Sequence, residues 1–387
     1  MNYLQSAQAL YEQMVRDRRH LHQHPEVGMD LPETCSYVMA RLAEMGYQPR
    51  RLGGGVTATV TGKPGGKVFL LRADMDALPM REESGLPFAS QRSCAHTCGH
   101  DMHTAMLLGA AQLLRDRAAE LNGTVKFMFQ PGEEVLSGAR SMIEAGILED
   151  PHVDAAMGAH MIPMIPAGLG GYGTGVVSAS SDHLVIRVEG RGGHGAHPQS
   201  TVDPINIGVH IHLALQELLS READPAELVV LTFGKFQGGD AANIIPSSAV
   251  LEGTLRTFSE PLRTHLLERI DTICTCTAEA FRGRAQVTDL CSTCSLQIDG
   301  DTAAAVAQGW QREGLKMLQR GEKMSGSEDF AEIAARVPST FFVVGGGTAQ
   351  DGCGVSLHNP KIRFREEALI YGAAAYASGA AMWLELH

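Results

Sequence analysis

Residues 96–103, HTCGHDMH, place three imidazoles, one thiol and one carboxylate within eight positions. A thiolate and an imidazole can bind the same metal ion, and Gly99 between Cys98 and His100 gives the backbone the freedom that such close ligation requires. Two ligands do not make a site, so this segment alone leaves other interpretations open. Asp101 could instead cap a helix, and the histidines could be ordinary core residues.

Donor side chains also follow three other apolar segments of the chain. Glu133 and Glu134 follow GTVKFMFQ, His160 stands near the end of VDAAMGAHM, and His358 comes after FFVVGGG. If these segments are parallel strands, their carboxyl ends meet at one edge of a sheet, where ligands bind. Nitrogen, oxygen and sulfur donors at one edge indicate a metal centre with one or two ions.

The adjacent carboxylates of Glu133 and Glu134 repel each other, and one of them would normally be driven towards protonation. A divalent cation removes this conflict. If Glu134 binds the metal, Glu133 can take a proton from water whose pKa the cation lowers to ~7 from about 15.7, and can return it to a leaving amine. The alternative is a surface helix that starts with two acids, which the helix dipole favours. That alternative does not explain the apolar strand before the pair.

The elements that must position these donors alternate along the chain. We expect a short strand at 67–71 and helices at 5–19, 33–45 and 102–117, with the apolar strands between them. Strands that alternate with helices predict an α/β domain with a mainly parallel sheet. Asp74 and Asp76 would then lie at the exit of the first strand, beside the other donors.

The pattern changes near residue 180. The order strand, helix, strand, strand, helix, strand over 180–292 is that of a ferredoxin-like α+β unit. We therefore expect a discontinuous catalytic domain of residues 1–179 and 293–387, with residues 180–292 as an inserted domain. Two domains also suit a chain of 387 residues, which exceeds what one core usually organises.

The composition excludes several kinds of partner. With 32 Lys and Arg against 44 Asp and Glu the net charge is −12, which argues against nucleic acid and anionic membranes. The first residues lack the apolar core of a signal peptide, and the apolar stretch 368–384 is short for a bilayer span. We expect a cytoplasmic protein whose eight cysteines are thiols rather than a disulfide framework.

Nine segments resemble a family of metal-dependent amidohydrolases. That family includes hippurate hydrolase, plant auxin-conjugate hydrolases and bacterial N-acyl-amino-acid deacylases, within the aminoacylase and carboxypeptidase G superfamily. The segments are, in order, RADMDALP, HTCGHDMH, QPGEE, GAHM, GGHGAHP, NIIP, GTLRTF, SEDF and LHNP. The resemblance runs from RRHLHQHPEV to the last helix. It implies a metallopeptidase-like catalytic domain that cleaves the amide bond of N-acyl amino acids with metal-activated water.

The resemblance also implies a centre of two divalent ions, which could be manganese, zinc, cobalt or nickel. The implied ligands are Cys98, His100, Glu134, His160 and His358. Cys98 would bridge the ions, and Glu133 would be the general base. Sister branches have a histidine ligand where this chain has Asp74, which we therefore leave out of the ligand set. Asp76 and Asp101 are expected to orient the ligands.

For the inserted domain the resemblance implies a lid and dimerisation role, in a homodimer or homotetramer. His194, in GRGGHGAHP, matches a lid histidine that reaches the neighbouring subunit's active site and helps to stabilise the oxyanion. Asn243 and Arg256 match residues that bind the amino acid's carboxylate, for which a guanidinium is well shaped. The ordinary alternative for Arg256 is a salt bridge on a strand. Where relatives carry a segment with proline and asparagine, this chain has CSTCSLQIDGD, so the roles of Cys291 and Cys294 stay open.

Two other functions remain as alternatives. The first is a carbamoylase or a dipeptidase on the same scaffold, although the cysteine of CGHD is typical of the acyl-amino-acid branch. The second is a catalytically silent metal-binding sensor, which would have no physical need for a base at Glu133. The apolar segment HMIPMIPAG favours aromatic or medium aliphatic acyl groups, but methionines fill cores as readily. The preferred acyl group, amino acid and metal are not determined by the sequence.

Overall fold

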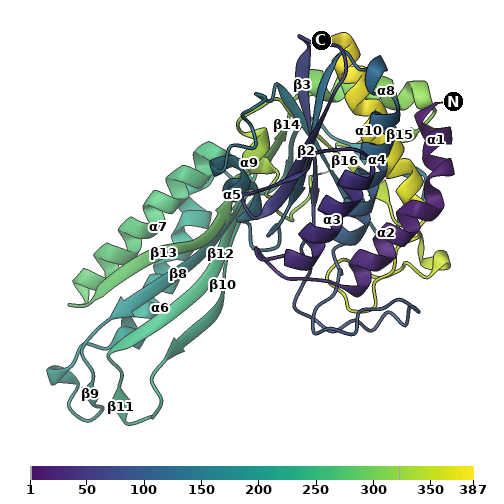
Figure 1. Cartoon of the computed structure of the whole chain (residues 1–387). Helices are drawn as coiled ribbons and strands as arrows, with labels where there is room; N and C mark the ends of the chain where they lie inside the picture. Colours follow the sequence, from purple (N-terminus) through teal and green to yellow (C-terminus); the bar gives the residue numbers. More distant parts are fainter. Residues whose placement is uncertain (1, 322) are drawn as a thin grey trace. The chain divides into compact units, whose positions relative to one another are not determined.

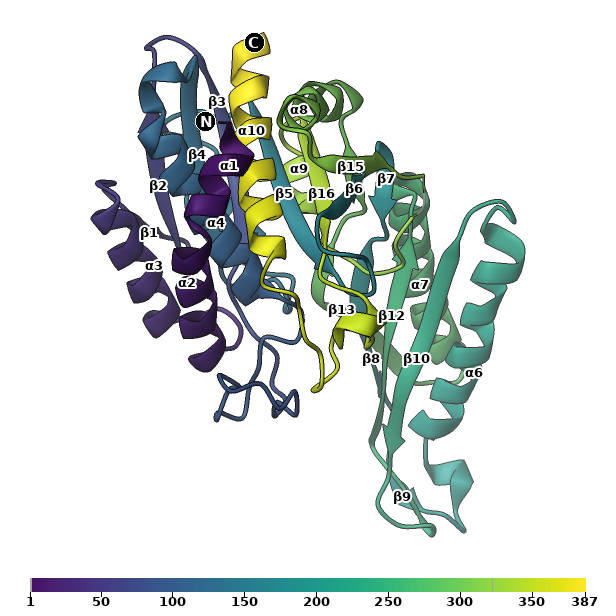
Figure 2. The ribbon, with the colours of Figure 1, turned by 90° about the vertical axis from the view of Figure 1, so that its right-hand side faces the viewer.

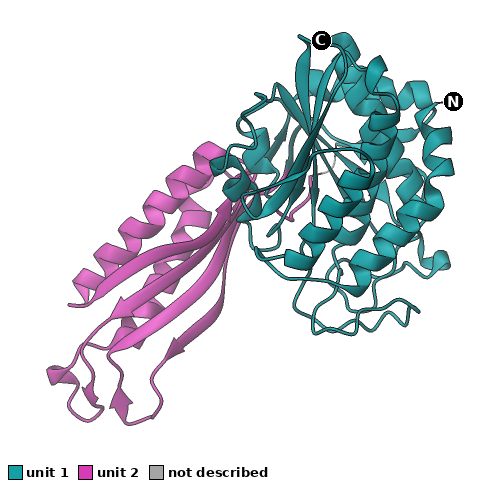
Figure 3. Ribbon diagram, viewed as in Figure 1, with its two compact units in different colours: residues 1–177, 296–322, 329–387 teal, residues 178–295, 323–328 magenta. Residues whose placement is uncertain are grey.

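The computed structural model describes residues 2–321 and 323–387, which form two compact units (Figure 3). Unit 1 contains the described residues of Met1–Val177, Leu296–Glu322 and Asp329–His387. Unit 2 contains Ser178–Ser295 and Lys323–Glu328. Residues 323–328, which the sequence places in the catalytic domain, thus cluster with unit 2.

Unit 1 is built around an eight-stranded sheet (Figure 1). In spatial order its strands are β1 (Arg50–Leu52), β2 (Gly55–Thr61), β4 (Gly123–Gln130), β3 (Lys67–Asp74), β5 (Ala155–Ile162), β16 (Ser339–Gly345), β6 (Leu169–Tyr172) and β15 (Lys316–Gln319). Strands β4, β3, β5 and β16 run parallel to one another, and the strands at the two sides include antiparallel pairs. The predicted α/β fold with a mainly parallel sheet is confirmed.

Helices cover both faces of this sheet (Figures 1 and 2). Helices α4 (His100–Asp116), α10 (Ala368–Leu386) and α8 (Gly300–Glu313) pack on one face, where α1 (Tyr3–Ala9), α2 (Tyr11–Gln23) and α3 (Pro32–Glu44) adjoin α4 and α10. The short helices α5 (Gly138–Glu144) and α9 (Ala331–Ala334) contact each other and lie on the opposite face. Strands β7 (Gly175–Ser178) and β14 (Leu296–Ile298) form a separate pair.

Helices α4 and α10 cross closely because small residues face each other there. A Cβ atom on Gly372 of α10 would lie 1.8 Å from the sulfur of Met106 on α4, so a larger residue there would require the Met106 side chain to move. Nearly every residue of α4 is buried, and a helix that is apolar on all sides belongs inside a core. Helix α10, which is the predicted C-terminal helix, crosses α4 closely in this core and is therefore a packing element. In the described part of the chain no helix is both long and apolar enough to cross a membrane.

Two predicted helix boundaries need correction. The helix expected at 5–19 is divided into α1 and α2 by a turn at Leu10, whose amide bonds back to Ser6 and Ala7. Helix α4 begins at His100 rather than at residue 102. His100 therefore stands in the first turn of a helix and not in the preceding loop.

Unit 2 is an α+β unit with an antiparallel four-stranded sheet. Its elements are, in chain order, β8 (Ser181–Glu189), α6 (Pro204–Glu217), β10 (Val229–Gly238), β12 (Ser248–Thr257), α7 (Glu260–Ala280) and β13 (Arg284–Thr293). The strands lie in the order β10, β12, β8, β13, which is the ferredoxin-like arrangement. The core between helices and sheet is apolar, with Ile186, Leu251 and Ile270 fully buried. A small extra sheet joins β9 (Gly193–His194) to β11 (Ile244–Ile245).

Candidate metal centre

The predicted donors gather at one edge of the unit 1 sheet. Asp76 follows β3, and the glutamate pair Glu133 and Glu134 follows the neighbouring strand β4. His160 lies near the end of β5, on the other side of β3, and His358 comes after β16. This edge is the carboxyl end of the parallel strands, where the sequence predicts a ligand site.

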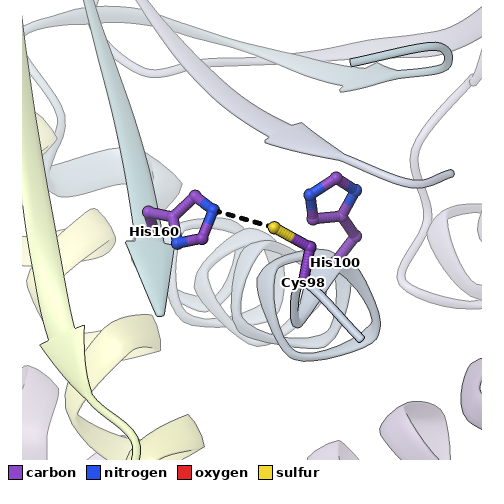
Figure 4. Close-up of side chains that lie close together, drawn as sticks. All are labelled: Cys98, His100 and His160. Carbon is purple, nitrogen blue, oxygen red and sulfur yellow. Dashed lines mark hydrogen bonds between the residues drawn. The ribbon is translucent and has the colours of Figure 1, made fainter. Parts of the chain in front are cut away.

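Cys98 is at the centre of the group. Its sulfur and one ring nitrogen each of His100 and His160 lie within 4.8 Å of one another, and so do the donor atoms of Cys98, Glu134 and His358. Figure 4 shows Cys98 and His100 at the start of α4 with His160 projecting from β5, and the Cys98 sulfur lies 3.4 Å from His160 Nε2. All five predicted ligands are therefore brought together, with Cys98 common to two groups of donors.

Gly99 makes this convergence possible. Its φ of 93° lies in the left-handed region, which glycine adopts without the steric cost that a side chain would bring. The left-handed residue turns the chain between Cys98 and His100 and is the N-terminal flank of α4. The sequence predicts this role for Gly99, whereas the alternative in which Asp101 caps the helix is wrong, because Asp101 lies inside the first turn.

The surroundings of His100 fit a divalent cation. The ring is fully buried, yet within the described residues neither ring nitrogen has a hydrogen-bond partner. Its Nε2 atom lies 3.7 Å from a carboxylate oxygen of Asp74, 3.9 Å from one of Glu134 and 4.0 Å from one of Glu133. These distances are too long for hydrogen bonds. The separation from Glu134, the predicted ligand among the three, suits two donors that would share an ion.

Glu134 has the properties of a carboxylate ligand. Its Oε1 atom is buried without a hydrogen-bond partner among the described residues and lies 3.4 Å from His358 Nε2. Burial opposes ionisation of Glu134, but the His358 and His100 rings outweigh it and hold the pKa of this carboxyl below its usual value. Glu134 is therefore a carboxylate with an oxygen available to a cation.

His160 is held in the tautomer that a metal ligand requires. Its Nδ1 atom donates a hydrogen bond to the carbonyl of Met161 at 2.7 Å, so the proton of the neutral ring resides there. The Nε2 atom, which faces Cys98, is then the atom with a lone pair. Burial and the neighbouring glutamates raise the pKa of the Cys98 thiol well above its usual range, although the charge of His100 acts in the opposite direction. A bound cation would be needed to keep Cys98 as a thiolate.

Asp76 orients the glutamate pair through the backbone. One carboxylate oxygen accepts the amide N–H of Glu133 at 3.0 Å, and the other accepts that of Glu134 at 3.1 Å. One Asp76 oxygen also lies 3.4 Å from His100 Nδ1. Asp76 thus fixes the turn that carries both glutamates, and its orienting role in a metal centre stays a prediction.

A buried network around Asp74 was not predicted. One oxygen of Asp74 accepts from Arg72 at 2.8 Å and the other from His103 Nδ1 at 2.6 Å, so both are already bonded. The exclusion of Asp74 from the ligand set stays a prediction, because donor atoms of Asp74, His100 and His103 also lie within 4.8 Å of one another. Burial lowers the pKa of His103 to about 4 despite the Asp74 charge, and its Nε2 accepts the amide N–H of Met161 at 2.8 Å. The network therefore positions the backbone beside His160.

Arg72 connects this network to two further segments. It is fully buried and donates to Gln130 at the end of β4 and to Asp329 before α9, each at 2.8 Å. The signal in the sequence is an arginine within the apolar strand KVFLLRAD, where a lone charge requires a partner. The identity of that partner depends on residues up to 257 positions away.

Asp101 is bonded away from the ligand atoms. Its Oδ2 oxygen accepts from Arg18 and His22 on α2, at 2.7 and 2.8 Å. Among the described residues no candidate ligand is hydrogen-bonded to Asp101. Its predicted influence on the ligands can therefore act only through the first turn of α4.

The three residues that the resemblance assigns to substrate all belong to unit 2. His194 lies on β9 and is exposed, and it pairs with Ile244 of β11. Asn243, just before β11, accepts the amide N–H of Gly195 through its backbone carbonyl, so it adjoins His194. Arg256 lies near the C-terminal end of β12 and donates to the carbonyl of Ser325 at 3.3 Å. Within unit 2, then, His194 and Asn243 are neighbours, whereas Arg256 lies on a different strand.

Comparisons with known proteins agree with this geometry. The model described as Peptidase family M20/M25/M40 matches residues 70–381. N-acetyl-L-cysteine deacetylase of Bacillus subtilis (strain 168) is 36% identical over 364 residues, 93% of this chain and 86% of the relative. N-acyl-L-amino acid amidohydrolase of Geobacillus stearothermophilus is 40% identical over 252 residues, 64% of this chain and 67% of the relative. The Bacillus subtilis YXEP protein, described as a dinuclear metal binding peptidase from the M20 family, has a crystal structure with a TM-score of 0.83 at 33% identity, covering 98% of this chain and 99% of that one. The chain belongs to peptidase family M20/M25/M40.

Proposed function

We propose that this protein is a metal-dependent amidohydrolase that cleaves N-acyl amino acids into a carboxylic acid and an amino acid. The observation that carries the proposal is the group of five donors with Glu133 beside it, in which the ring nitrogens of His100 and the Oε1 atom of Glu134 are buried without hydrogen-bond partners within the described residues. The two relatives from Bacillus subtilis and Geobacillus stearothermophilus described above are named as a deacetylase of N-acetyl-L-cysteine and an amidohydrolase of N-acyl-L-amino acids.

The donor set supports two divalent ions held by Cys98, His100, Glu134, His160 and His358. The two groups of donors share Cys98, which suits a bridging thiolate. When bound, the ions would polarise the substrate carbonyl and lower the pKa of an attacking water. Mixed sulfur, nitrogen and oxygen donors suit zinc, manganese, cobalt and nickel, so the metal is a matter for measurement.

Glu133 would move the proton during the reaction. Its carboxylate lies 4.0 Å from His100 Nε2, and its backbone is fixed by Asp76. From that position Glu133 takes a proton from the attacking water and returns it to the nitrogen of the leaving amino acid. The carboxylate is largely buried, which limits competing exchange with bulk water.

Unit 2 would provide the lid and the dimer contact. Strand β10 is an edge of its sheet, and this strand and helix α6 expose apolar side chains such as Val230, Phe236 and Leu213. An exposed edge strand with apolar side chains favours pairing with another chain. A cytoplasmic location would suit the eight cysteines, none of which forms a disulfide bond in the described structure.

The activity is tested with metal-stripped protein and a panel of substrates. N-acetyl-methionine, hippurate, an N-carbamoyl amino acid and a dipeptide are incubated with added manganese or zinc, and amino acid release is measured. We expect release from the acyl amino acids only after metal is restored. Preferred cleavage of the carbamoyl substrate or the dipeptide would favour the other hydrolases of this scaffold. Metal binding without cleavage of any substrate would favour the silent sensor.

His194→Ala should lower kcat by about 10²- to 10³-fold, with little change in KM, because a donor to the oxyanion acts mainly in the transition state. His197→Ala is the matched control, since both histidines are exposed on the same loop and their rings lie 5.5 Å apart. Mixing His194→Ala with Glu133→Gln subunits and allowing exchange should restore activity if the histidine acts on the neighbouring subunit. Equal losses in the two histidine variants would contradict this role.

A further inference from the structure

A second buried polar cluster lies at the first turn of α4. Arg18 Nε and His22 Nδ1, both on α2, donate to the same oxygen of Asp101, at 2.7 and 2.8 Å. The side chains of Arg18, His22 and Asp101 are 1%, 5% and 0% exposed. Asp101 directly follows His100, so two side chains of α2 bind the residue next to a candidate metal ligand.

His22 also connects Asp101 to the loop that contains Glu82. Its Nε2 atom lies 3.0 Å from a carboxylate oxygen of Glu82, so both ring nitrogens face carboxylates. Carboxylates only accept hydrogen bonds, which means that both nitrogens must donate and that the ring is an imidazolium. Burial and the Arg18 charge lower the pKa of His22, but the bonds to Asp101 and Glu82 outweigh them and raise it.

Glu82 is itself fixed by its neighbours. It accepts hydrogen bonds from the hydroxyl of Ser84 and from the amide of Ser90, the latter at 2.7 Å. The Phe88 ring lies 4.6 Å from the Arg18 guanidinium, which adds a cation–π contact. The cluster therefore connects three segments, namely α2, the loop 82–90 and the start of α4, and Arg18 Nη1 also donates to Glu366 at 3.3 Å.

The start of α4 needs an anchor of this kind. Its flanking residue is Gly99, and among the residues that the structure describes no side chain caps the helix. An uncapped first turn after a left-handed glycine tends to fray, and in this protein that turn carries His100 and adjoins Cys98. For stability alone, apolar side chains of similar size would serve as well as a buried ion cluster. What the ion cluster adds is a fixed position and orientation for Asp101.

We propose that Arg18 and His22 are positioning residues for the metal centre: by binding Asp101 they hold the first turn of α4 so that Cys98 and His100 are preorganised for the metal ions. The proposal rests on the proposed metal-dependent function. It assigns no contact with substrate to either residue. Arg19, the next residue on α2, is the natural comparison, because it shares with Arg18 the Glu366 carboxylate and the Phe88 ring but, unlike Arg18, is not hydrogen-bonded to Asp101.

The test compares Arg18→Met with Arg19→Met in the full-length protein. Mn²⁺ affinity is measured by competition with a chromophoric chelator, and the thiolate-to-cobalt absorption band is recorded after titration with Co²⁺. In Arg18→Met we expect Mn²⁺ affinity and metal-saturated kcat to fall by about 10- to 100-fold, the typical cost of losing an outer partner of a metal site. KM should stay nearly unchanged, and the cobalt band should weaken. Arg19→Met should match the wild type in all four measurements.

A purely structural role would lower the melting temperature of Arg18→Met while metal affinity, cobalt band and metal-saturated kcat stay at wild-type values, and that result would overturn the proposal. If Arg18→Met does not fold, Arg18→Lys and His22→Gln provide the same comparison, with Arg18→Lys expected to keep more metal affinity than His22→Gln. The metal readouts do not require hydrolysis. Wild-type protein that binds Mn²⁺ but cleaves no amide would therefore refute the proposed function while still testing Arg18.

Discussion

Glu133→Gln should reduce kcat by about 10²- to 10⁴-fold, which is the usual contribution of a general acid–base residue. Glutamine has nearly the same shape as glutamate but cannot accept the proton of the attacking water. Because Asp76 holds residue 133 through its backbone amide, the substitution leaves the turn and the neighbouring Glu134 in place. We therefore expect the variant to keep two metal ions and an unchanged KM.

The measurement is the rate of N-acetyl-methionine hydrolysis, together with the metal content of the same sample. Glu144→Gln, on the exposed end of α5, is the control for the loss of one negative charge. A Glu133→Gln protein with full metal content and wild-type kcat would refute the assignment of Glu133 as the base. A variant that loses its metal would instead point to Glu133 as a ligand.

The fold was predictable where local pattern and topology agree. The segments that became β4 and β5 are short and mostly apolar, and each has donor residues at or just after its end, so both their type and the position of their exits could be read from the sequence. The ferredoxin-like order of unit 2 followed from alternation in the same way. The break at Leu10 was not predictable, because the apolar spacing continues through it and only a tighter turn of backbone bonds divides the two helices.

The candidate ligands were predictable from residue type, whereas the groups that hold them were not. Cysteine, histidine and glutamate that recur after strands at one edge of a sheet are the donor types of a metal site. Arg18, in contrast, resembles an ordinary surface arginine in the sequence, and Arg72, although it stands within an apolar segment, does not reveal its partner. Their buried partners, Asp101 and Asp329, lie 83 and 257 residues away, and such pairings arise only from the packing of complete elements.

Cys98→Ala should have the largest effect on metal binding, because Cys98 is the one donor that the Cys98, His100, His160 group and the Cys98, Glu134, His358 group share. If Cys98 bridges two ions, as we propose, its loss would remove a ligand from each of them and one negative charge from the centre. We expect metal content to fall from two ions per chain to one or none. Activity should drop by at least about a thousandfold, since several kcal/mol of transition-state charge stabilisation depends on the ions.

Cys94→Ala separates this effect from the loss of a thiol as such. Cys94 lies four residues earlier, and its sulfur donates to the carbonyl of Pro25 at 3.2 Å rather than facing the ligand atoms. The Cys94→Ala variant should keep full metal content, measured by elemental analysis, and full activity, measured by hydrolysis of N-acetyl-methionine. Cys98→Asp restores an anionic donor and should recover part of the metal content, because a carboxylate can also bridge two ions. If Cys98→Ala retained two ions, the sulfur would be a neighbour of the centre, and the bridge would have to come from Glu134, whose Oε1 faces both His100 and His358.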